Sequence, residues 1–171
     1  SLGAAFRPAH AGVVERTDVA RGARFCARRR RVWADGACGK YSMQHALLLL
    51  GIPVTQKDTT KATKVPPIMT RLFGTNEGQL KRGLKYFGCD AIERSFKNPD
   101  KLRKELDALL AIGCPAILAV EQNEHWVVIA GKQSKNKYYW IDSADDDLIG
   151  YSEWTDIVDW IDNKEYYLIG V

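Results

Sequence analysis

The pattern of hydrophobic and polar positions predicts a helical first half of the chain. Residues 40–50 are apolar with helix-forming residues throughout, and Gly51 and Pro53 mark the end of this segment. Shorter helices are predicted over residues 55–64 and 100–111. Another helix is predicted after residue 74, with Thr75 as its cap and with Leu80, Leu84 and Phe87 at helical spacing.

The pattern changes at Gly113, where the second half of the chain begins. Short β-branched or aromatic runs separated by polar turns are typical of neighbouring strands. These runs cover residues 116–121, 125–132, 137–141 and 165–169. Helices followed by strands predict an α+β fold, with an N-terminal helical half packed on a C-terminal antiparallel sheet.

Length and composition predict one folded domain preceded by an extension. The chain has 171 residues, of which 46% are hydrophobic and 27% charged, enough for a single core. Residues 1–31 are rich in Ala, Gly and Arg, so we interpret them as a basic N-terminal extension or linker and residues 32–171 as the domain. There is no initiator Met and no secretory signal pattern, so Ser1 is expected to be either a processing boundary or the start of an expressed piece of a longer protein.

Charge and cysteine content argue against several functional classes. The net charge is +4, but residues 1–40 carry nine Lys/Arg against three Asp/Glu, and the remaining residues carry sixteen against eighteen. The basic character therefore belongs to the N-terminal segment, and nucleic-acid binding is not favoured. Four cysteines without a C-x-x-C pair predict neither a disulfide framework nor a zinc site, and they favour a reducing compartment. No apolar run approaches the ~20 residues of a membrane span.

The candidate nucleophile is Cys38, which lies in a glycine-flanked turn leading into the first helix. A helix N-terminus offers unpaired backbone N–H groups and a partial positive charge, which favour a thiolate and can bind a developing oxyanion. Gly36 and Gly39 are expected to allow a sharp turn and the close approach of a substrate carbonyl. Taken alone, a cysteine at this place is more often a small buried residue.

His125 is the candidate base, and Asp142 is the candidate group that orients it. His125 begins a predicted strand, and the next predicted strand ends at Asp142. If these strands pair as a hairpin, the carboxylate comes near the imidazole and can fix its tautomer and ring angle. His45 is the rival base, but it lies about 10 Å from Cys38 along the same helix, too far for direct proton transfer.

The ordered set of motifs over residues 32–160 resembles the bacteriocin-leader-processing (double-glycine) peptidase domains and their papain-like relatives. The set comprises Cys-Gly before a helix, Gly51 thirteen residues after Cys38, a Gly-Thr helix start, Gly-x-Pro before a strand, His-Trp-Val-Val, and a strand that ends in Asp. The resemblance implies a papain-like fold and a cysteine peptidase, with Cys38 as nucleophile, His125 as base and Asp142 as orienting acid. It implies no cofactor and no metal.

The chain departs from that family at three positions. The family has Gln six residues before the nucleophile, as an oxyanion donor, where this chain has Val32. It also has Asp before the Cys and Pro after the orienting Asp, where this chain has Ala37 and Ser143. A double-glycine substrate is therefore not assumed.

Three functions remain open from the sequence. The first is a cysteine protease that cleaves a protein or peptide through a Cys38 acyl-enzyme, as a bacterial toxin or effector domain. The second is a papain-like glutamine deamidase that uses the same residues, and the third is a catalytically degenerate peptide-binding domain. The implied partners are a protein or peptide substrate and a cognate inhibitor or immunity protein. The implied location is cytoplasmic, or secreted with action in a target-cell cytoplasm.

The remaining chemical residues are interpreted as structural. The acidic stretch of residues 142–147 lacks the glycine and the bidentate Glu of a calcium-binding loop, so Asp145, Asp146 and Asp147 are assigned to a solvated turn. Cys89 and Cys114 flank apolar segments and are predicted to pack in the core.

Overall fold

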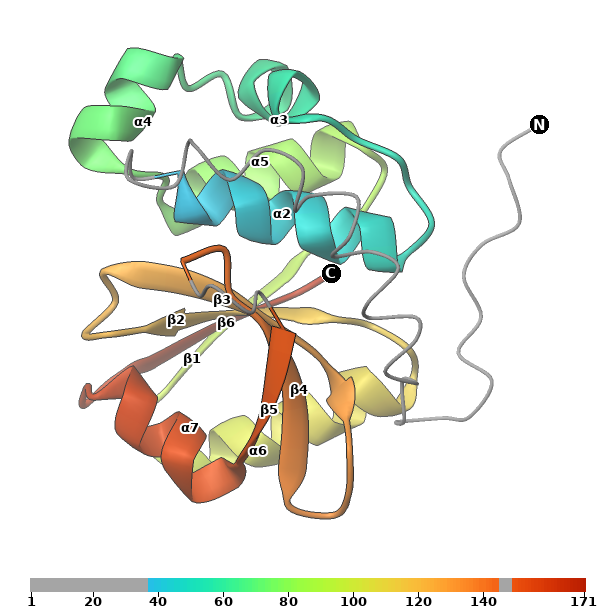
Figure 1. Cartoon of the computed structure of the whole chain (residues 1–171), viewed down its shortest axis with the longest axis vertical. Helices are drawn as coiled ribbons and strands as arrows, with labels where there is room; N and C mark the ends of the chain where they lie inside the picture. The colour runs from blue at the N-terminus through green and yellow to red at the C-terminus, as the bar shows by residue number, and fades with distance from the viewer. Residues whose placement is uncertain (1–36, 145–148) are drawn as a thin grey trace.

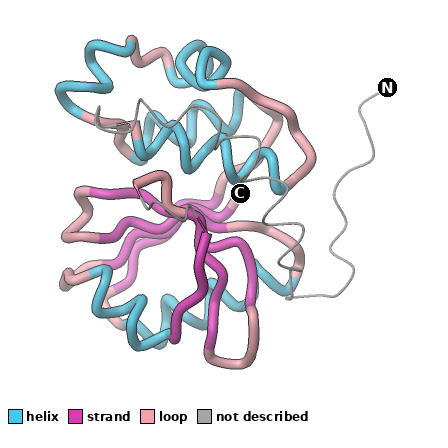
Figure 2. The backbone as a smooth tube through the Cα atoms, viewed as in Figure 1, coloured by secondary structure: helices cyan, strands magenta, loops and turns pink. Residues whose placement is uncertain are grey.

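The computed structural model describes residues 37–144 and 149–171, and in this part the chain forms three layers (Figure 1). The extension predicted for residues 1–31, together with Val32 and Gly36, lies outside the described residues. A six-stranded sheet forms the middle layer, and helices cover both of its faces (Figure 2). The predicted α+β class is confirmed.

The sheet is antiparallel throughout. Its spatial order is β1-β6-β2-β3-β4-β5, and each neighbouring pair of strands runs in opposite directions. The strands are β1 (Ile92–Phe96), β2 (Ala116–Val120), β3 (His125–Lys132), β4 (Lys137–Ile141), β5 (Ile149–Glu153) and β6 (Tyr166–Gly170). The strands β2, β3 and β4 are consecutive in sequence and adjacent in space, so the chain from residue 116 to residue 141 is a meander.

The helices divide into two groups, one on each face of the sheet (Figure 1). One group consists of α2 (Cys38–Leu49), α3 (Gln56–Thr63), α4 (Pro67–Phe73) and α5 (Glu77–Tyr86). The other consists of α6 (Pro99–Ala111) and α7 (Trp154–Ile161). The expected helical half is thus split, because α6 packs on the face opposite α2.

Two hydrophobic cores hold these layers together. One contains Met43, Leu47, Leu80 and Leu84 from the first helix group together with alternate residues of the central strands. The other lies between the sheet and α6 and α7. Ten of the twelve residues of α2 are buried, because the sheet covers one side of this helix and its neighbouring helices cover the other. Burial on nearly all sides explains why this segment is apolar without a clear helical stripe.

The caps of the helices differ in one place from the prediction. Asn76, and not Thr75, caps α5, because its side chain accepts a hydrogen bond from the Gln79 N–H while the Gln79 side chain accepts one from the Asn76 N–H.

Four elements were not predicted from the sequence: α4, β1, β5 and α7. None of the helices in the described ranges has the length and apolar character needed to cross a bilayer.

Candidate active site

Cys38 is the first residue of α2, as predicted. The N-cap residue is Ala37, whose side chain cannot accept a hydrogen bond, and the first backbone bond of the helix runs from the Tyr41 N–H to the Ala37 carbonyl at 3.0 Å. The N–H groups of residues 38–40 therefore precede the helical ladder. Because they point out of the helix end together with the positive end of its dipole, they favour an anion at Cys38.

His125 and Asp142 meet at one end of a hairpin formed by β3 and β4. The two strands pair with Val128 opposite Ile141, so Asp142 directly follows β4 while His125 opens β3. The His125 Nε2 atom lies 2.6 Å from the Asp142 Oδ1 atom. That oxygen also accepts a hydrogen bond from the Ala144 N–H at 2.9 Å, which holds the carboxylate in place. The predicted proximity of these two side chains is confirmed.

The environment of His125 favours its protonated form. Burial opposes the charge, but interactions with Asp142 and Cys38 outweigh it and raise the pKa of His125 to about 10. Nε2 is engaged by Asp142, which leaves Nδ1 as the ring nitrogen available to Cys38. The imidazole therefore connects a thiol at a helix start to a carboxylate.

A short network fixes α2 to the strand that carries His125. The Ser42 hydroxyl donates to the Trp126 carbonyl at 2.9 Å, and the Trp126 indole N–H donates to the Thr75 carbonyl at 2.9 Å. Both bonds are buried. Because Trp126 follows His125 in β3, these bonds hold α2 and the segment before α5 against the strand that carries His125.

Gly39 is required for a different reason from the one predicted. It lies inside α2, and a Cβ atom there would come within 2.9 Å of the Thr75 Cβ and 3.3 Å of the Trp126 Cδ1. Its role is thus close packing beside Cys38, and not a sharp turn. Gly36 lies outside the described residues.

We expect Gly39→Ala to displace Thr75 or Trp126 and so to disturb the register between α2 and β3. Activity on any peptide substrate should fall at least tenfold, while the protein keeps its secondary structure, as measured by kcat/KM and circular dichroism. Gly78→Ala is the matched control, because its Cβ would meet only the Asn76 side chain, at 3.5 Å. An unchanged rate in Gly39→Ala would contradict this role.

His45 is a buried and neutral residue. It is 1% exposed, its ring stacks on Tyr41 at 6.5 Å between centroids, and neither of its ring nitrogens has a hydrogen-bond partner within the described part of the chain. Burial lowers its pKa to about 4, although the charge of Asp142 acts in the opposite direction. Its interpretation as a structural residue agrees with this environment.

A lowered pKa at His45 makes the protein less stable in acid. Between pH 6.5 and about 4 the unfolded chain binds a proton at this site and the folded chain does not, so unfolding is favoured as the pH falls. Urea unfolding of the wild type should show about 2–3 kcal/mol more loss of stability between pH 7.5 and 4.5 than His45→Leu. Equal losses in the two proteins would show that His45 titrates normally.

The other cysteines lie in less favourable environments. Cys89 and Cys114 are half-buried and pack against the two hydrophobic cores, as predicted. Burial raises the pKa of both thiols, and the charge of Asp90 adds to the effect at Cys89. Both are therefore poor nucleophiles at neutral pH. Cys26 lies outside the described residues.

Comparisons with known proteins identify the fold. No protein-family model matches the chain, and no curated protein matches its sequence significantly. A solved structure is similar: the peptidase domain of Streptococcus ComA, a bi-functional ABC transporter involved in a quorum-sensing pathway. The TM-score is 0.55 at 15% sequence identity, over 78% of this chain and 90% of that domain. The fold is that of a papain-like peptidase. The predicted fold is thus confirmed.

Several predictions about the site stay untested. Val32, the position of the missing glutamine, and Asp145, Asp146 and Asp147 lie outside the described residues. Within residues 37–144 and 149–171, no group of three or more His, Cys, Asp or Glu side chains is arranged to hold a metal ion. The sequence analysis did not recognise the bonds of Ser42, Thr75 and Trp126, which join residues far apart in the chain. Lys40, two residues after Cys38, was likewise not singled out.

Proposed function

We propose that this protein is a cysteine peptidase that cleaves a protein or peptide amide, with Cys38 as nucleophile, His125 as base and then acid, and Asp142 as the orienting carboxylate. The observation that carries the proposal is the 2.6 Å contact between His125 Nε2 and Asp142 Oδ1, together with the interactions of both Asp142 and Cys38 with the His125 ring that raise its pKa. The likeness of the fold to a peptidase domain supports the same chemistry.

The reaction begins from the ion pair in which His125 holds the proton of Cys38 and Sγ is the thiolate. The Sγ atom attacks the carbonyl carbon of the substrate, and the negative charge that develops on the oxygen is stabilised by the backbone N–H groups of the first turn of α2. The imidazolium donates its proton to the leaving amine, which breaks the C–N bond and leaves a thioester. A water molecule, deprotonated by His125, then hydrolyses the thioester and restores the thiol.

Asp142 acts through His125 and not on the substrate. Its Oδ1 atom accepts the Nε2–H and thereby keeps Nδ1 directed at Cys38. Its negative charge also stabilises the imidazolium of the ion pair with Cys38. The Ala144 N–H holds the carboxylate, so the orientation of the ring does not depend on the substrate.

The substrate is proposed to be a protein in a target cell, with the chain acting as a toxin or effector domain in that cell's cytoplasm. The absence of the family's glutamine at position 32 argues for a substrate other than a double-glycine leader. A cognate inhibitor or immunity protein is a further proposed partner. No cofactor takes part in the proposed steps.

Mass spectrometry of host-cell proteins incubated with wild type and with Cys38→Ala tests the proposed reaction. We expect new peptide termini that appear only with the wild type. A mass increase of about one dalton at glutamine, without cleavage, would indicate a deamidase instead. No Cys38-dependent change would indicate a peptide-binding domain.

We expect Cys38 to react with iodoacetamide much faster than Cys89 and Cys114 at pH 7, by about a hundredfold. Only Cys38 combines a helix start with a bonded imidazole, whereas burial raises the pKa of the other two thiols. His125→Ala should slow this labelling without unfolding the protein. Peptide mapping after timed alkylation gives the rate at each site, and equal rates at the three thiols would argue for a binding module.

A further inference from the structure

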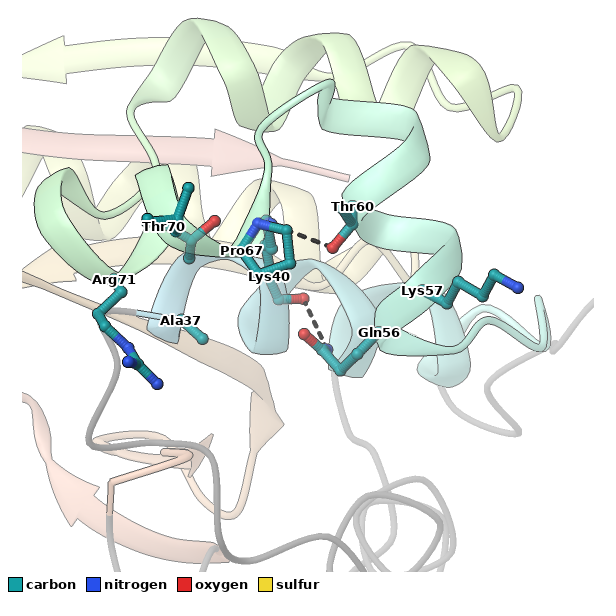
Figure 3. A pocket seen from close by; sticks show the side chains of 9 residues that line it. Ala37, Lys40, Gln56, Lys57, Thr60, Pro67, Thr70 and Arg71 are labelled. Atoms are coloured by element: carbon teal, nitrogen blue, oxygen red, sulfur yellow. Dashed lines mark hydrogen bonds between the residues drawn. The ribbon is translucent and has the colours of Figure 1, made fainter.

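A pocket of about 580 Å³ lies between α2, α3 and α4, beside the start of the nucleophile helix (Figure 3). Ala37, which precedes Cys38, and Lys40, which follows it by two residues, belong to its lining. Thr60 from α3 and Ile68 from α4 also line it. The pocket therefore adjoins the first turn of the helix that carries Cys38.

Lys40 is the unusual residue of this pocket, because its ammonium is buried and bonded to neutral oxygens in the described part of the chain. The residue is 3% exposed, and its Nζ atom donates to the Val65 carbonyl at 2.6 Å and to the Thr60 hydroxyl at 3.1 Å. Both acceptors are neutral, and within the described ranges no carboxylate lies in salt-bridge contact with Lys40. An ammonium has three N–H groups, and the described residues accept two of them, so the third is the one that we assign to a ligand in the pocket.

A buried cation without a partner is costly, and a carboxylate in the pocket would relieve that cost. Burial also lowers the pKa of Lys40, as expected for an uncompensated ammonium. Among the described residues, no Asp or Glu belongs to the lining of the pocket.

Apolar residues in the lining of the pocket can also contact the methylene groups of a ligand side chain. Ala37, Pro67 and Ile68 are apolar lining residues, and Ile68 is 68% exposed at the rim. An acidic side chain has both parts, because its methylene groups can contact these residues while its carboxylate reaches the ammonium. The amide of Asn or Gln has the same shape but cannot form the ion pair.

We propose that this pocket is a substrate subsite that binds an Asp or Glu side chain of the peptide, with Lys40 as the cation that pairs with it. The inference rests on the proposed peptidase function of Cys38, since it names a feature of that substrate. Ala37 joins the pocket to the nucleophile, and an extended peptide spans about 3.3–3.6 Å per residue, so the acidic residue lies within a few residues of the scissile bond.

Peptide selection with an inactive protein tests the subsite independently of cleavage. Immobilised Cys38→Ala is incubated with a random heptapeptide library, and the bound peptides are sequenced. We expect Asp or Glu to be enriched about tenfold over Asn and Gln at one fixed position. The enrichment should disappear in Cys38→Ala/Lys40→Met and persist in Cys38→Ala/Lys61→Met, whose replaced lysine is an exposed residue of α3 outside the pocket lining.

The outcomes separate the subsite from the proposed reaction. Absence of acidic enrichment in the Cys38→Ala protein would overturn the subsite, and this result does not depend on the folding of any Lys40 variant. Enrichment that survives Lys40→Met in a protein with native circular dichroism would also overturn it. Wild-type cleavage of the same library, read from new peptide termini, tests the peptidase function separately. Cleavage without a preference for Asp or Glu would contradict the proposed subsite and leave the proposed peptidase function intact.

Discussion

Replacing His125 with alanine is expected to lower kcat/KM for peptide cleavage by a factor on the order of 10³ or more, because catalytic groups that act as a unit lose most of their rate enhancement when one is removed. The ring is the only proposed proton carrier between Cys38 and the leaving amine. Without it, the thiol must lose its proton to solvent and the amine must leave without a donor. Steady-state cleavage of one defined peptide measures the loss.

The control for this prediction is His45→Leu, which removes the other histidine of the described part of the chain. His45 has no hydrogen bond to Cys38 or Asp142 and is closed off from solvent, so its replacement should change kcat/KM less than threefold at pH 7.5. Melting temperatures of both variants exclude unfolding as the cause. If His125→Ala cleaved the peptide at a rate close to the wild type, the assignment of the base would be wrong.

The elements that carry the proposed site could be predicted because strong local signals define them. Gly51 and Pro53 mark the end of the apolar segment that forms α2. The bounds of β3 and β4 were predicted correctly from their β-branched and aromatic runs. Hairpin pairing then places His125 and Asp142 together without any long-range information. The proximity of His125 and Asp142 could therefore be predicted from the order of the strands.

The elements that were not predicted, such as α4 and β1, have hydrophobic patterns that are not typical of a helix or a strand. In α4, Ile68 and Leu72 are more than half exposed, so these two apolar residues give no signal of a buried face. Pro66 and Pro67 resemble helix breakers, although they stand at the N-cap and first position of α4. The edge strand β1 has no fully buried residue. Such segments are stabilised by contacts with neighbouring helices and strands, and these contacts cannot be predicted from the periodicity of apolar residues.

The choice between Thr75 and Asn76 as a cap shows how a tertiary contact changes a local prediction. Both residues favour N-caps, but the Thr75 carbonyl accepts the Trp126 indole N–H and its residue packs beside Gly39. Asn76 is left to pair with Gln79. The pocket beside Lys40 is a similar case, since it exists only where α3 and α4 close over α2, and no motif spans those three segments.

Asp142→Asn is expected to lower kcat by about a hundredfold or more while leaving KM nearly unchanged, because Asp142 contacts the His125 ring and not the substrate. Asparagine has nearly the same shape but no charge, so it cannot stabilise the imidazolium formed when Cys38 loses its proton. Its amide N–H₂ can also face Nε2, which then becomes the acceptor. That arrangement puts the proton on Nδ1, where it cannot receive the proton of Cys38.

The same substitution should move the alkaline limit of activity to lower pH. The hydrogen bond and charge of Asp142 are among the causes that raise the pKa of His125 to about 10, so their loss lets this pKa fall toward its ordinary value. The imidazolium, which must protonate the leaving amine, is then lost at a lower pH, and the falling limb of the kcat profile shifts with it. Asp159→Asn, at an exposed position of α7, is the matched control and should keep the wild-type profile. Chelators should leave the wild-type rate unchanged. A loss in Asp142→Asn that appeared in KM alone, or a pH profile that did not move, would remove Asp142 from the mechanism and leave His125 to act on Cys38 unaided.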